Sequence, residues 1–146
     1  MPVSTAAVGK TYPPTTYAVG REKIREYARA VFEHDPRYLD LDAARAAGYR
    51  DLVAPPMFCV VYSAPAMVPA ILDPDVGIDF ARMVHGGQDF RWGPLVVAGD
   101  EITTAVTVAA IEERDGKGFF VFESVSTNQE GHTVCVGTWT NIVRGA

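Results

Sequence analysis

The chain carries three histidines, the residue type whose ordinary pKa of about 6.5 suits proton transfer near neutral pH. His85 lies beside Gly86-Gly87 in a segment with strand character, where the paired glycines suggest a bulge or a close backbone approach. A lone histidine on a strand is commonly structural and held by hydrogen bonds, so His85 is either a structural residue or a general base. His34 lies at the predicted end of a helix and His132 in a predicted turn, so we expect both at the surface.

The remaining composition excludes several classes of site and partner. Cys59 and Cys135 lack the spacing of metal ligands, so we predict reduced, small apolar residues of a cytoplasmic protein with neither a metal site nor a cofactor. The net charge is −5, and no cluster of lysine and arginine extends beyond one helix. We therefore expect neither nucleic acid nor a membrane surface as a partner. The first ten residues lack the apolar core of a secretion signal.

Twenty-one residues without a formal charge, from Leu52 to Leu72, occupy the middle of the chain. Pro55-Pro56 suits the first turn of a helix, where a missing N–H costs little. Pro65 and Pro69 would each cost roughly 3 kcal/mol in a helix interior. This cost argues against a membrane span and favours a helix that is kinked or cut short near its far end. Since the stretch is apolar on every side, we predict a central helix that the rest of the domain must cover.

The flanking segments predict helices before the apolar stretch and strands after it. Apolar residues at helical spacing predict an amphipathic helix over residues 21–32, and Asp40 or Asp42 is expected to cap a short second helix. A lead-in interrupted by prolines, residues 8–19, predicts a short edge strand. The last sixty residues predict four further strands, at residues 83–92, 102–111, 118–127 and 133–143.

Tight turns at Asp115-Gly116 and Asn128–Gly131 join the later strands, so these strands must be antiparallel. A sheet with one apolar face and a wholly apolar helix have one economical arrangement, in which the sheet curls around the helix. The length of 146 residues fits one domain. We therefore predict the α+β class, with residues 1–146 forming a single domain.

A long central helix wrapped by an antiparallel sheet is the hotdog fold, and several short motifs narrow the match. The chain resembles the MaoC-like dehydratases. Within them it is most similar to the N-terminal-domain type, which includes the substrate-binding subunit of heterodimeric (3R)-hydroxyacyl-ACP dehydratases. The resemblance covers residues 8–143 and rests on the order and spacing of these motifs: Gly20–Ala28, Asp35-Pro36, Gly48-Tyr49, Ala54-Pro55, Val84–Phe90, Pro94 and Ala98–Asp100.

Active members of this family reversibly add water to a trans-2-enoyl thioester of coenzyme A or acyl carrier protein. The aspartate and histidine of their motif, Asp-x-Asn-Pro-Ile/Leu-His-x-Asp, activate the water. Laying Pro36 and Asp40 on this motif puts Glu33 at the position of the catalytic aspartate. Asp35 then replaces the asparagine and Tyr38 the histidine. A tyrosine with a pKa near 10 is a poor base at pH 7, so the resemblance implies that this chain lacks the usual catalytic pair.

Glu33 and Tyr38 consequently have two interpretations. Together with His85 they form an altered acid–base site, or they are a helix-end charge and an aromatic side chain packed on the core. The family also uses a backbone N–H at the start of the central helix to polarise the thioester carbonyl, which suits the positive end of a helix.

The resemblance also implies where an acyl thioester would bind. Ala54 and Pro55 lie at the start of the central helix, where we expect the thioester end of the substrate. Gln88 and Arg91 are candidates for contacts to its pantetheine or phosphates. In this fold the core of the helix and the wall of an acyl tunnel coincide, and the residues expected there are Met57, Phe58, Val61, Tyr62 and Met67.

Three hypotheses for the function remain open. In the leading one the chain is a subunit of a (3R)-hydroxyacyl-thioester dehydratase or enoyl hydratase of fatty-acid metabolism, and it holds the acyl chain while a partner supplies the Asp/His pair. In the second it is a homodimeric hydratase that uses Glu33, Tyr38 and His85. In the third it is a non-catalytic acyl-thioester binding module. Domains of this fold typically pair side by side, so the resemblance implies a homodimer or a heterodimer with a catalytic MaoC-type subunit.

Overall fold

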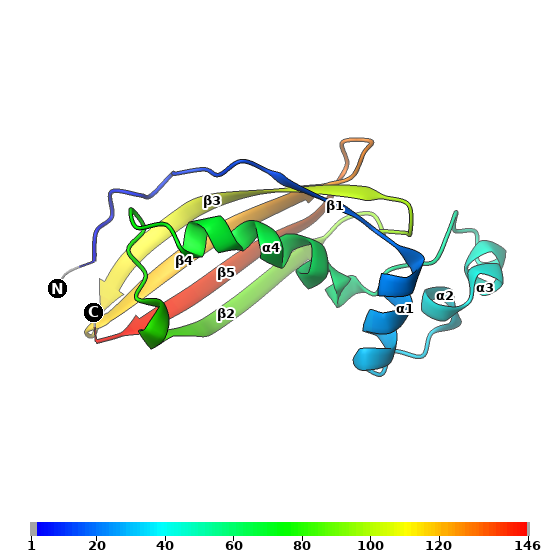
Figure 1. Ribbon diagram of the computed structural model, residues 1–146, viewed down its shortest axis with the longest axis horizontal. Coiled ribbons are helices and arrows are strands. Elements are labelled where there is room, and N and C mark those ends of the chain that lie inside the picture. Colours follow the sequence, from blue (N-terminus) through cyan, green and yellow to red (C-terminus); the bar gives the residue numbers. More distant parts are fainter. Residues whose placement is uncertain (1–2, 146) are drawn as a thin grey trace.

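A five-stranded antiparallel sheet lies against one central helix in the computed structural model, which describes residues 3–145 (Figure 1). The elements are β1 (Thr15–Ala18), α1 (Arg21–Ala30), α2 (Pro36–Leu39), α3 (Leu41–Ala46), η1 (Pro56–Phe58), α4 (Cys59–Ile71), η2 (Phe80–Arg82), β2 (Met83–Trp92), β3 (Glu101–Arg114), β4 (Lys117–Thr127) and β5 (Thr133–Arg144). No helix of residues 3–145 is long and apolar enough to cross a membrane.

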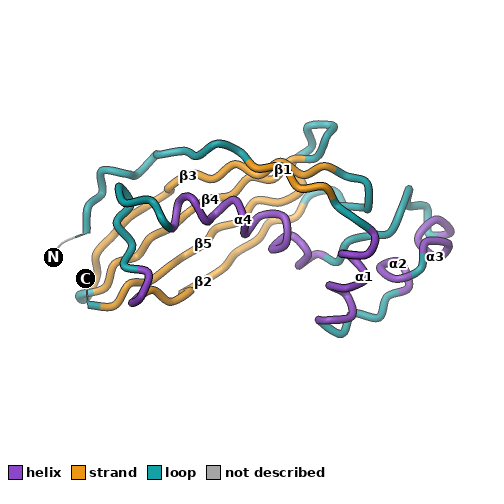
Figure 2. Tube along the Cα trace, in the orientation of Figure 1, coloured by secondary structure: helices purple, strands orange, loops and turns teal. Residues whose placement is uncertain are grey.

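The strands lie in the order β1-β3-β4-β5-β2, and every neighbouring pair is antiparallel (Figure 2). The turn between β3 and β4 has φ values of 51° at Asp115 and 67° at Gly116, which is the left-handed geometry of a tight hairpin turn. The predicted bulge in β2 is also present, because the pairing with β5 shifts register between His85 and Gly87. Because β1 and β2 stand at the two ends of the strand order, they form the two edges of the sheet.

The core lies between α4 and the sheet face that it covers. Along β4 the buried positions alternate, and Phe120 and Phe122 are 1% and 0% exposed. They pack with Ala66 and Met67 of α4 in one apolar cluster. Alternation of period two in a strand places such residues on one face, so the sequence pattern alone turns the apolar side of β4 toward the helix.

The central helix keeps both internal prolines and continues past them. A 3₁₀ turn at η1 leads into α4, which extends to Ile71 with Pro65 and Pro69 inside it. The expectation that the helix is cut short is therefore wrong. Both prolines lie on the exposed side of α4, where carbonyl groups that lose a helical partner are open to water, and this reduces the cost of the missing N–H groups.

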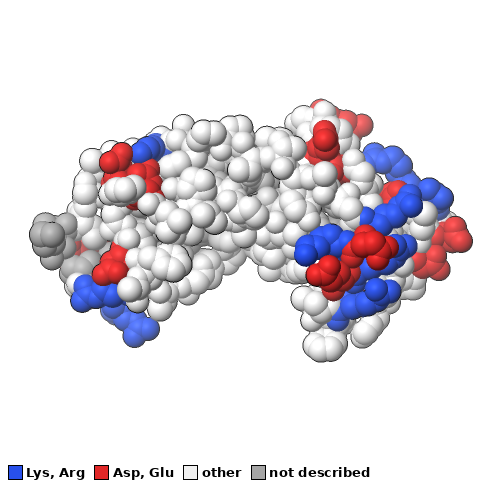
Figure 3. All heavy atoms as spheres, viewed as in Figure 1, with Lys and Arg blue, Asp and Glu red and all other residues white. Residues whose placement is uncertain are grey.

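The sheet covers only one side of α4 in the single chain. Val68 is 50% exposed and Leu72 is 60% exposed. We predicted that the domain covers every side of the helix, but it covers only the side that faces the sheet. The space-filling view in the orientation of Figure 1 shows an uncharged surface over the middle of the molecule (Figure 3). Charged residues gather at its two ends, most densely over α1, α2 and α3.

The three short helices form a lobe beyond one end of the sheet (Figure 1). α1 ends at Ala30, two residues before the predicted end, and Phe32 follows with φ of 59° and 81% exposure. The short second helix predicted from the sequence is α3. Of its two proposed capping residues, Asp40 caps it, because the Asp40 side chain accepts from the Asp42 N–H. The segment from Glu33 to Asp40, which includes α2, thus lies in this lobe between the end of α1 and the start of α3.

A buried aspartate joins the lobe to the sheet. Asp100 holds loop backbone, because its Oδ2 accepts from the Val97 N–H at 2.9 Å. Its Oδ1 accepts from Arg50 Nη2 at 2.6 Å and from Gln129 Nε2 at 2.9 Å. Because Asp100 is 4% exposed, these contacts balance a buried charge and tie the segment after α3 to the β4–β5 turn.

Candidate functional site

An apolar cavity of about 210 Å³ opens beside the start of α4. Its outer rim is formed by Pro56 and by the connection after β2, residues 92–95. Its inner wall consists of buried side chains, namely Ala54, Phe58, Cys59, Tyr62, Val96 and Val134. The cavity therefore extends from the surface into the core along the first turn of the central helix.

Trp92 fixes the two sides of the rim relative to each other. Its indole Nε1 donates to the carbonyl oxygen of Pro56 at 2.8 Å. The next residue, Gly93, donates its N–H to Val134 O at 2.9 Å. A Cβ added at Gly93 would lie 2.2 Å from Thr133 O, so only glycine fits this close approach. The end of β2 is thus held against both the helix start and β5.

The inner end of the cavity is built from aromatic rings and thiols. Phe58 is fully buried, and its ring centroid lies 5.5 Å from that of Tyr27 and 6.3 Å from that of Tyr62. Burial raises the pKa of Tyr62, whose hydroxyl contacts Cys135. The contact with Cys135, together with burial, raises the pKa of Cys59. Tyr62 and Cys59 therefore stay neutral at pH 7, and Cys59 is an apolar wall residue and not a nucleophile.

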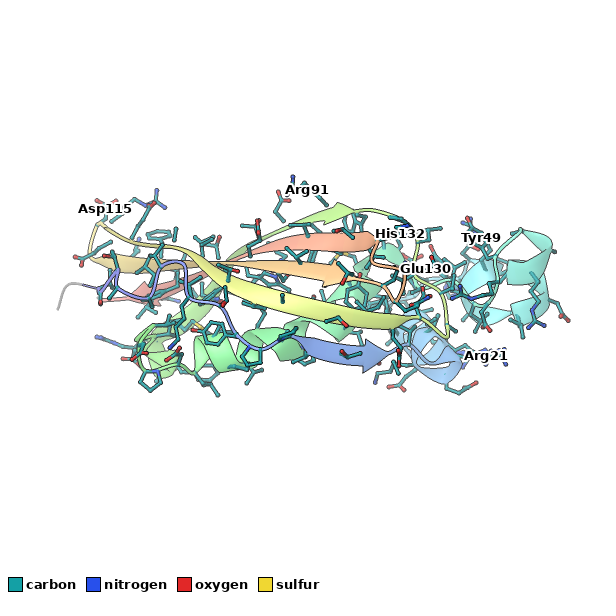
Figure 4. All side chains as sticks on the ribbon, turned by 90° about the horizontal axis from the view of Figure 1, so that it is seen from above. Arg21, Tyr49, Arg91, Asp115, Glu130 and His132 are labelled. Atoms are coloured by element: carbon teal, nitrogen blue, oxygen red, sulfur yellow. The ribbon has the colours of Figure 1, made fainter. Side chains whose placement is uncertain are left out.

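The predicted substrate contacts divide into two groups in the structure. Ala54, Pro55, Phe58 and Tyr62 line the cavity, whereas Met57, Val61 and Met67 do not. Gln88 and Arg91 are exposed on β2 and also lie outside the lining. Arg91 projects from β2 on the side of the sheet away from α4 (Figure 4). His132 lies in the β4–β5 turn, as predicted, with its side chain 62% exposed.

Sequence reasoning missed the wall that faces the helix. Trp92, Leu95, Val96 and Val134 all line the cavity. They meet the start of α4 through pairings between segments far apart in the sequence, namely β2 with β5 and residues 52–54 with residues 96–98. The one local signal is an aromatic residue at the end of a strand followed by Gly93-Pro94, which indicates a rigid turn with a large apolar side chain at its base.

The residues at the hydratase-motif positions have structural contacts. Asp35 caps α2 by accepting from the Arg37 N–H at 2.9 Å, and the side-chain bond from Arg37 lowers the pKa of Asp35 to about 2. Tyr38 is half-buried against the core cluster that contains Phe58. Burial, followed by the charges of Asp35 and Glu33, raises the pKa of Tyr38, which makes it a still poorer base than a free tyrosine. Glu33 is exposed.

His85 does not join Glu33 and Tyr38 within one chain. It pairs with Asn141 across β2 and β5, while Trp92 pairs with Cys135. Seven residues of strand separate His85 from Trp92, which corresponds to roughly 20 Å. The His85 ring contacts Trp139 edge-on at a centroid distance of 6.3 Å. His85 therefore lies away from the start of α4, on the edge strand β2.

The start of the central helix offers few backbone donors. Proline has no N–H, and both Pro55 and Pro56 lie at this end. The Phe58 N–H is bonded to Pro55 O at 2.9 Å. Met57 therefore carries the first amide N–H of the helix. The positive end of the helix dipole faces an apolar cavity, and each of the two prolines removes one N–H donor from this end.

Comparisons with known proteins identify this architecture. Residues 6–136 match the family described as FAS1-like, dehydratase domain region. The chain belongs to this family. A UPF0336 protein of Saccharopolyspora erythraea is 42% identical over 146 residues, covering 99% of this chain and 94% of the relative. The UPF0336 protein Lxx02810 of Leifsonia xyli subsp. xyli is 43% identical, covering 99% and 98%.

Solved structures of related dehydratases have the same fold. The HadBC (3R-hydroxyacyl-ACP dehydratase) complex of Mycobacterium tuberculosis contains a chain with 29% identity and a TM-score of 0.82, covering 94% of this chain and 98% of that one. A MaoC-like dehydratase has 31% identity and a TM-score of 0.86, and the match covers 97% of this chain and 43% of that longer chain. The fold of this FAS1-like dehydratase-region protein is the single hotdog of MaoC-like dehydratases, with an antiparallel sheet around a central helix.

Proposed function

We propose that the whole chain, residues 1–146, acts as one hotdog subunit of a cytoplasmic (3R)-hydroxyacyl-thioester dehydratase. In this proposal the chain holds the acyl group of a thioester of coenzyme A or acyl carrier protein, and a partner hotdog subunit supplies the Asp/His pair that adds or removes water. The HadBC chain that is similar to this one belongs to a complex described as a (3R)-hydroxyacyl-ACP dehydratase.

One observation carries the proposal: the motif positions serve the fold and leave no Asp/His pair. The Asp35 carboxylate is occupied by capping α2 and by Arg37. Burial raises the pKa of Tyr38, so its hydroxyl stays protonated at pH 7. A reaction that needs a positioned base to activate water therefore finds only Glu33 at these positions, an exposed carboxylate without the histidine that it would work with.

The cavity beside α4 gives the chain a substrate-binding role. Its buried inner wall is apolar and preformed, which suits the hydrocarbon part of a thioester. Each methylene transferred from water into such a wall contributes about 0.8 kcal/mol. The thioester group would then lie near the rim between Pro56 and Trp92, where the bond between these residues already fixes the geometry.

The free edge of β2 gives a partner a place to bind. β2 is ten residues long, and its outer edge has no neighbouring strand in the described chain. Such an edge presents unpaired N–H and C=O groups that a second sheet can satisfy. A partner there would lie beside His85 and Gln88, whose cross-strand neighbours Asn141 and Trp139 belong to the face that packs on α4.

The test is a hydration assay with crotonyl-CoA on three samples: the purified chain, a MaoC-type partner with an intact Asp-x-Asn-Pro-x-His motif, and the two co-purified. We expect the chain alone to be inactive and the complex to exceed the partner alone. As a control, Tyr38→Phe in this chain is expected to change the rate of the complex by less than tenfold, because a lost acid–base group costs about 10²- to 10⁴-fold.

The alternatives give different results in the same assay. Turnover by the purified chain at rates typical of active hydratases, abolished by His85→Ala without a loss of thermal stability, would support the homodimeric enzyme with Glu33, Tyr38 and His85 and contradict the proposal. Saturable acyl-CoA binding with no gain in turnover on mixing with any MaoC-type partner would support the non-catalytic binding module.

A further inference from the structure

We propose that Tyr62 is the end wall of the acyl-binding cavity and sets the longest acyl chain that the protein accepts. This inference rests on the proposed function and adds the substrate class: a thioester of a short, unbranched acyl chain. It assigns to one side chain the discrimination between short and long substrates.

The course of the cavity places Tyr62 at its inner end. The rim residues Trp92 and Leu95 are 51% and 46% exposed. Cys59 and Tyr62, on the first turns of α4, are 1% and 3% exposed and line the same cavity. The next turn of the helix, at Ala66, does not contribute to the lining. An acyl chain that enters at the rim therefore meets the Tyr62 ring before it can pass along α4.

The Tyr62 ring is held from two sides. Its centroid lies 6.3 Å from that of Phe58, and the Phe58 ring in turn packs against Tyr27 at 5.5 Å. Tyr62 also packs in the same buried cluster as Val134 and Cys135 of β5. A ring packed on both sides cannot turn aside without losing these contacts. Tyr62 is thus a rigid stop and not a mobile gate.

Removing the ring would lengthen the cavity along α4. Residues four apart lie on the same face of a helix, so Ala66 follows Tyr62 on the side that faces the sheet and is 4% exposed. Its small side chain leaves the space of a missing Tyr62 ring open in that direction. Met67, by contrast, is 2% exposed and packs in the second apolar cluster without lining the cavity.

The size of the cavity agrees with a short chain. Its volume of about 210 Å³ is below the roughly 300–1,000 Å³ of pockets that enclose drug-sized ligands. The lining contains no charged side chain, so the terminal part of the bound group should be plain hydrocarbon. A long or branched chain would have to leave carbons in water or displace the Tyr62 ring.

The test is the chain-length dependence of binding, measured by titration calorimetry with butyryl-, hexanoyl-, octanoyl-, decanoyl- and dodecanoyl-CoA. For the wild type we expect affinity to rise about fourfold per added methylene, the factor for burying one methylene, and then to stop rising at a short chain length. In Tyr62→Ala the rise should continue to longer chains. Tyr62→Leu serves if the alanine variant does not fold.

Two matched variants separate the wall from general effects on the core. Tyr62→Phe keeps the ring and should leave the break point where it is in the wild type. Met67→Ala removes a buried side chain of the same helix outside the cavity and should do the same. If acyl-CoA binds but the break point stays fixed in Tyr62→Ala or Tyr62→Leu, the inference about Tyr62 is wrong while the proposed function stands. If the wild type binds none of these acyl groups, carried either by coenzyme A or by acyl carrier protein, both are wrong.

Discussion

Asp35, at the position of the asparagine in the hydratase motif, stabilises the fold through its contacts with Arg37. The side-chain bond from Arg37 lowers the pKa of Asp35 to about 2, below the ordinary value of about 3.9. A carboxylate with a lowered folded-state pKa stabilises the protein above its unfolded pKa and loses this contribution as the pH falls through the folded pKa. The stabilisation is therefore present above about pH 4 and disappears toward about pH 2.

This gives a prediction at the scale of one side chain. Asp35→Ala removes the cap of α2 and should lower the free energy of unfolding by about 0.5–2 kcal/mol at pH 7. Asp35→Asn keeps a capping oxygen but not the charge, so it should show a smaller loss of stability than the wild type between about pH 4 and pH 2. Urea unfolding at a series of pH values measures both. Equal pH dependence in wild type and Asp35→Asn would contradict the assignment.

The elements show what local pattern can and cannot predict. The strand Met83–Trp92 and the bulge at Gly86 were predicted and are found with the same bounds, because strand alternation and paired glycines are local signals. β3 continues to Arg114, beyond the predicted end at residue 111, because its ladder with β4 holds polar residues in the strand. The prolines of α4 misled the prediction, since their cost depends on which side of the helix faces water.

The candidate site could likewise be predicted only in part from local sequence pattern. The wall from the central helix could be predicted, and Ala54, Pro55, Phe58 and Tyr62 do line the cavity. The facing wall, from Trp92 to Val96 with Val134, could not, because it reaches the helix only when the sheet closes. The separation of His85 from Glu33 was hidden for the same reason, as sequence order does not give the direction of β2 relative to the lobe.

Gly93 provides a prediction at the scale of elements. Its absent side chain lets the end of β2 approach β5, because a Cβ there would lie 2.2 Å from Thr133 O. Gly93→Ala should therefore cost about 1–3 kcal/mol of stability, the range for overpacking, and should weaken acyl-CoA binding at the rim. Gly87→Ala, within β2 itself, is the control, because its Cβ would meet Thr140 at an ordinary 3.7 Å. Similar thermal denaturation of the two variants would count against this account.

At the scale of the molecule, the two edges of the sheet differ in a way that favours one position for the proposed partner. β1 is four residues long, and the proline-containing lead-in covers a further part of the β3 edge through backbone hydrogen bonds of Gly9, Lys10 and Tyr12 to Val106 and Val108. β2 is ten residues long and open along its outer side. A hotdog partner that extends the sheet gains the most hydrogen bonds at β2, and the uncharged surface over α4 lies beside this strand (Figure 3).

Hydrogen exchange of the chain alone and in the complex tests this arrangement. Amides of β2 that point away from β5 should exchange rapidly in the single chain and become protected by at least tenfold in the complex, because they gain strand partners. The amides of Thr15–Ala18 on the opposite edge are the internal control and should exchange equally in both samples. Protection confined to β1, or to the sheet face away from α4, would place the partner elsewhere. Protection along β2 as far as Trp92 would put the seam beside the rim of the cavity, where the catalytic pair of a partner can meet the thioester that this chain holds.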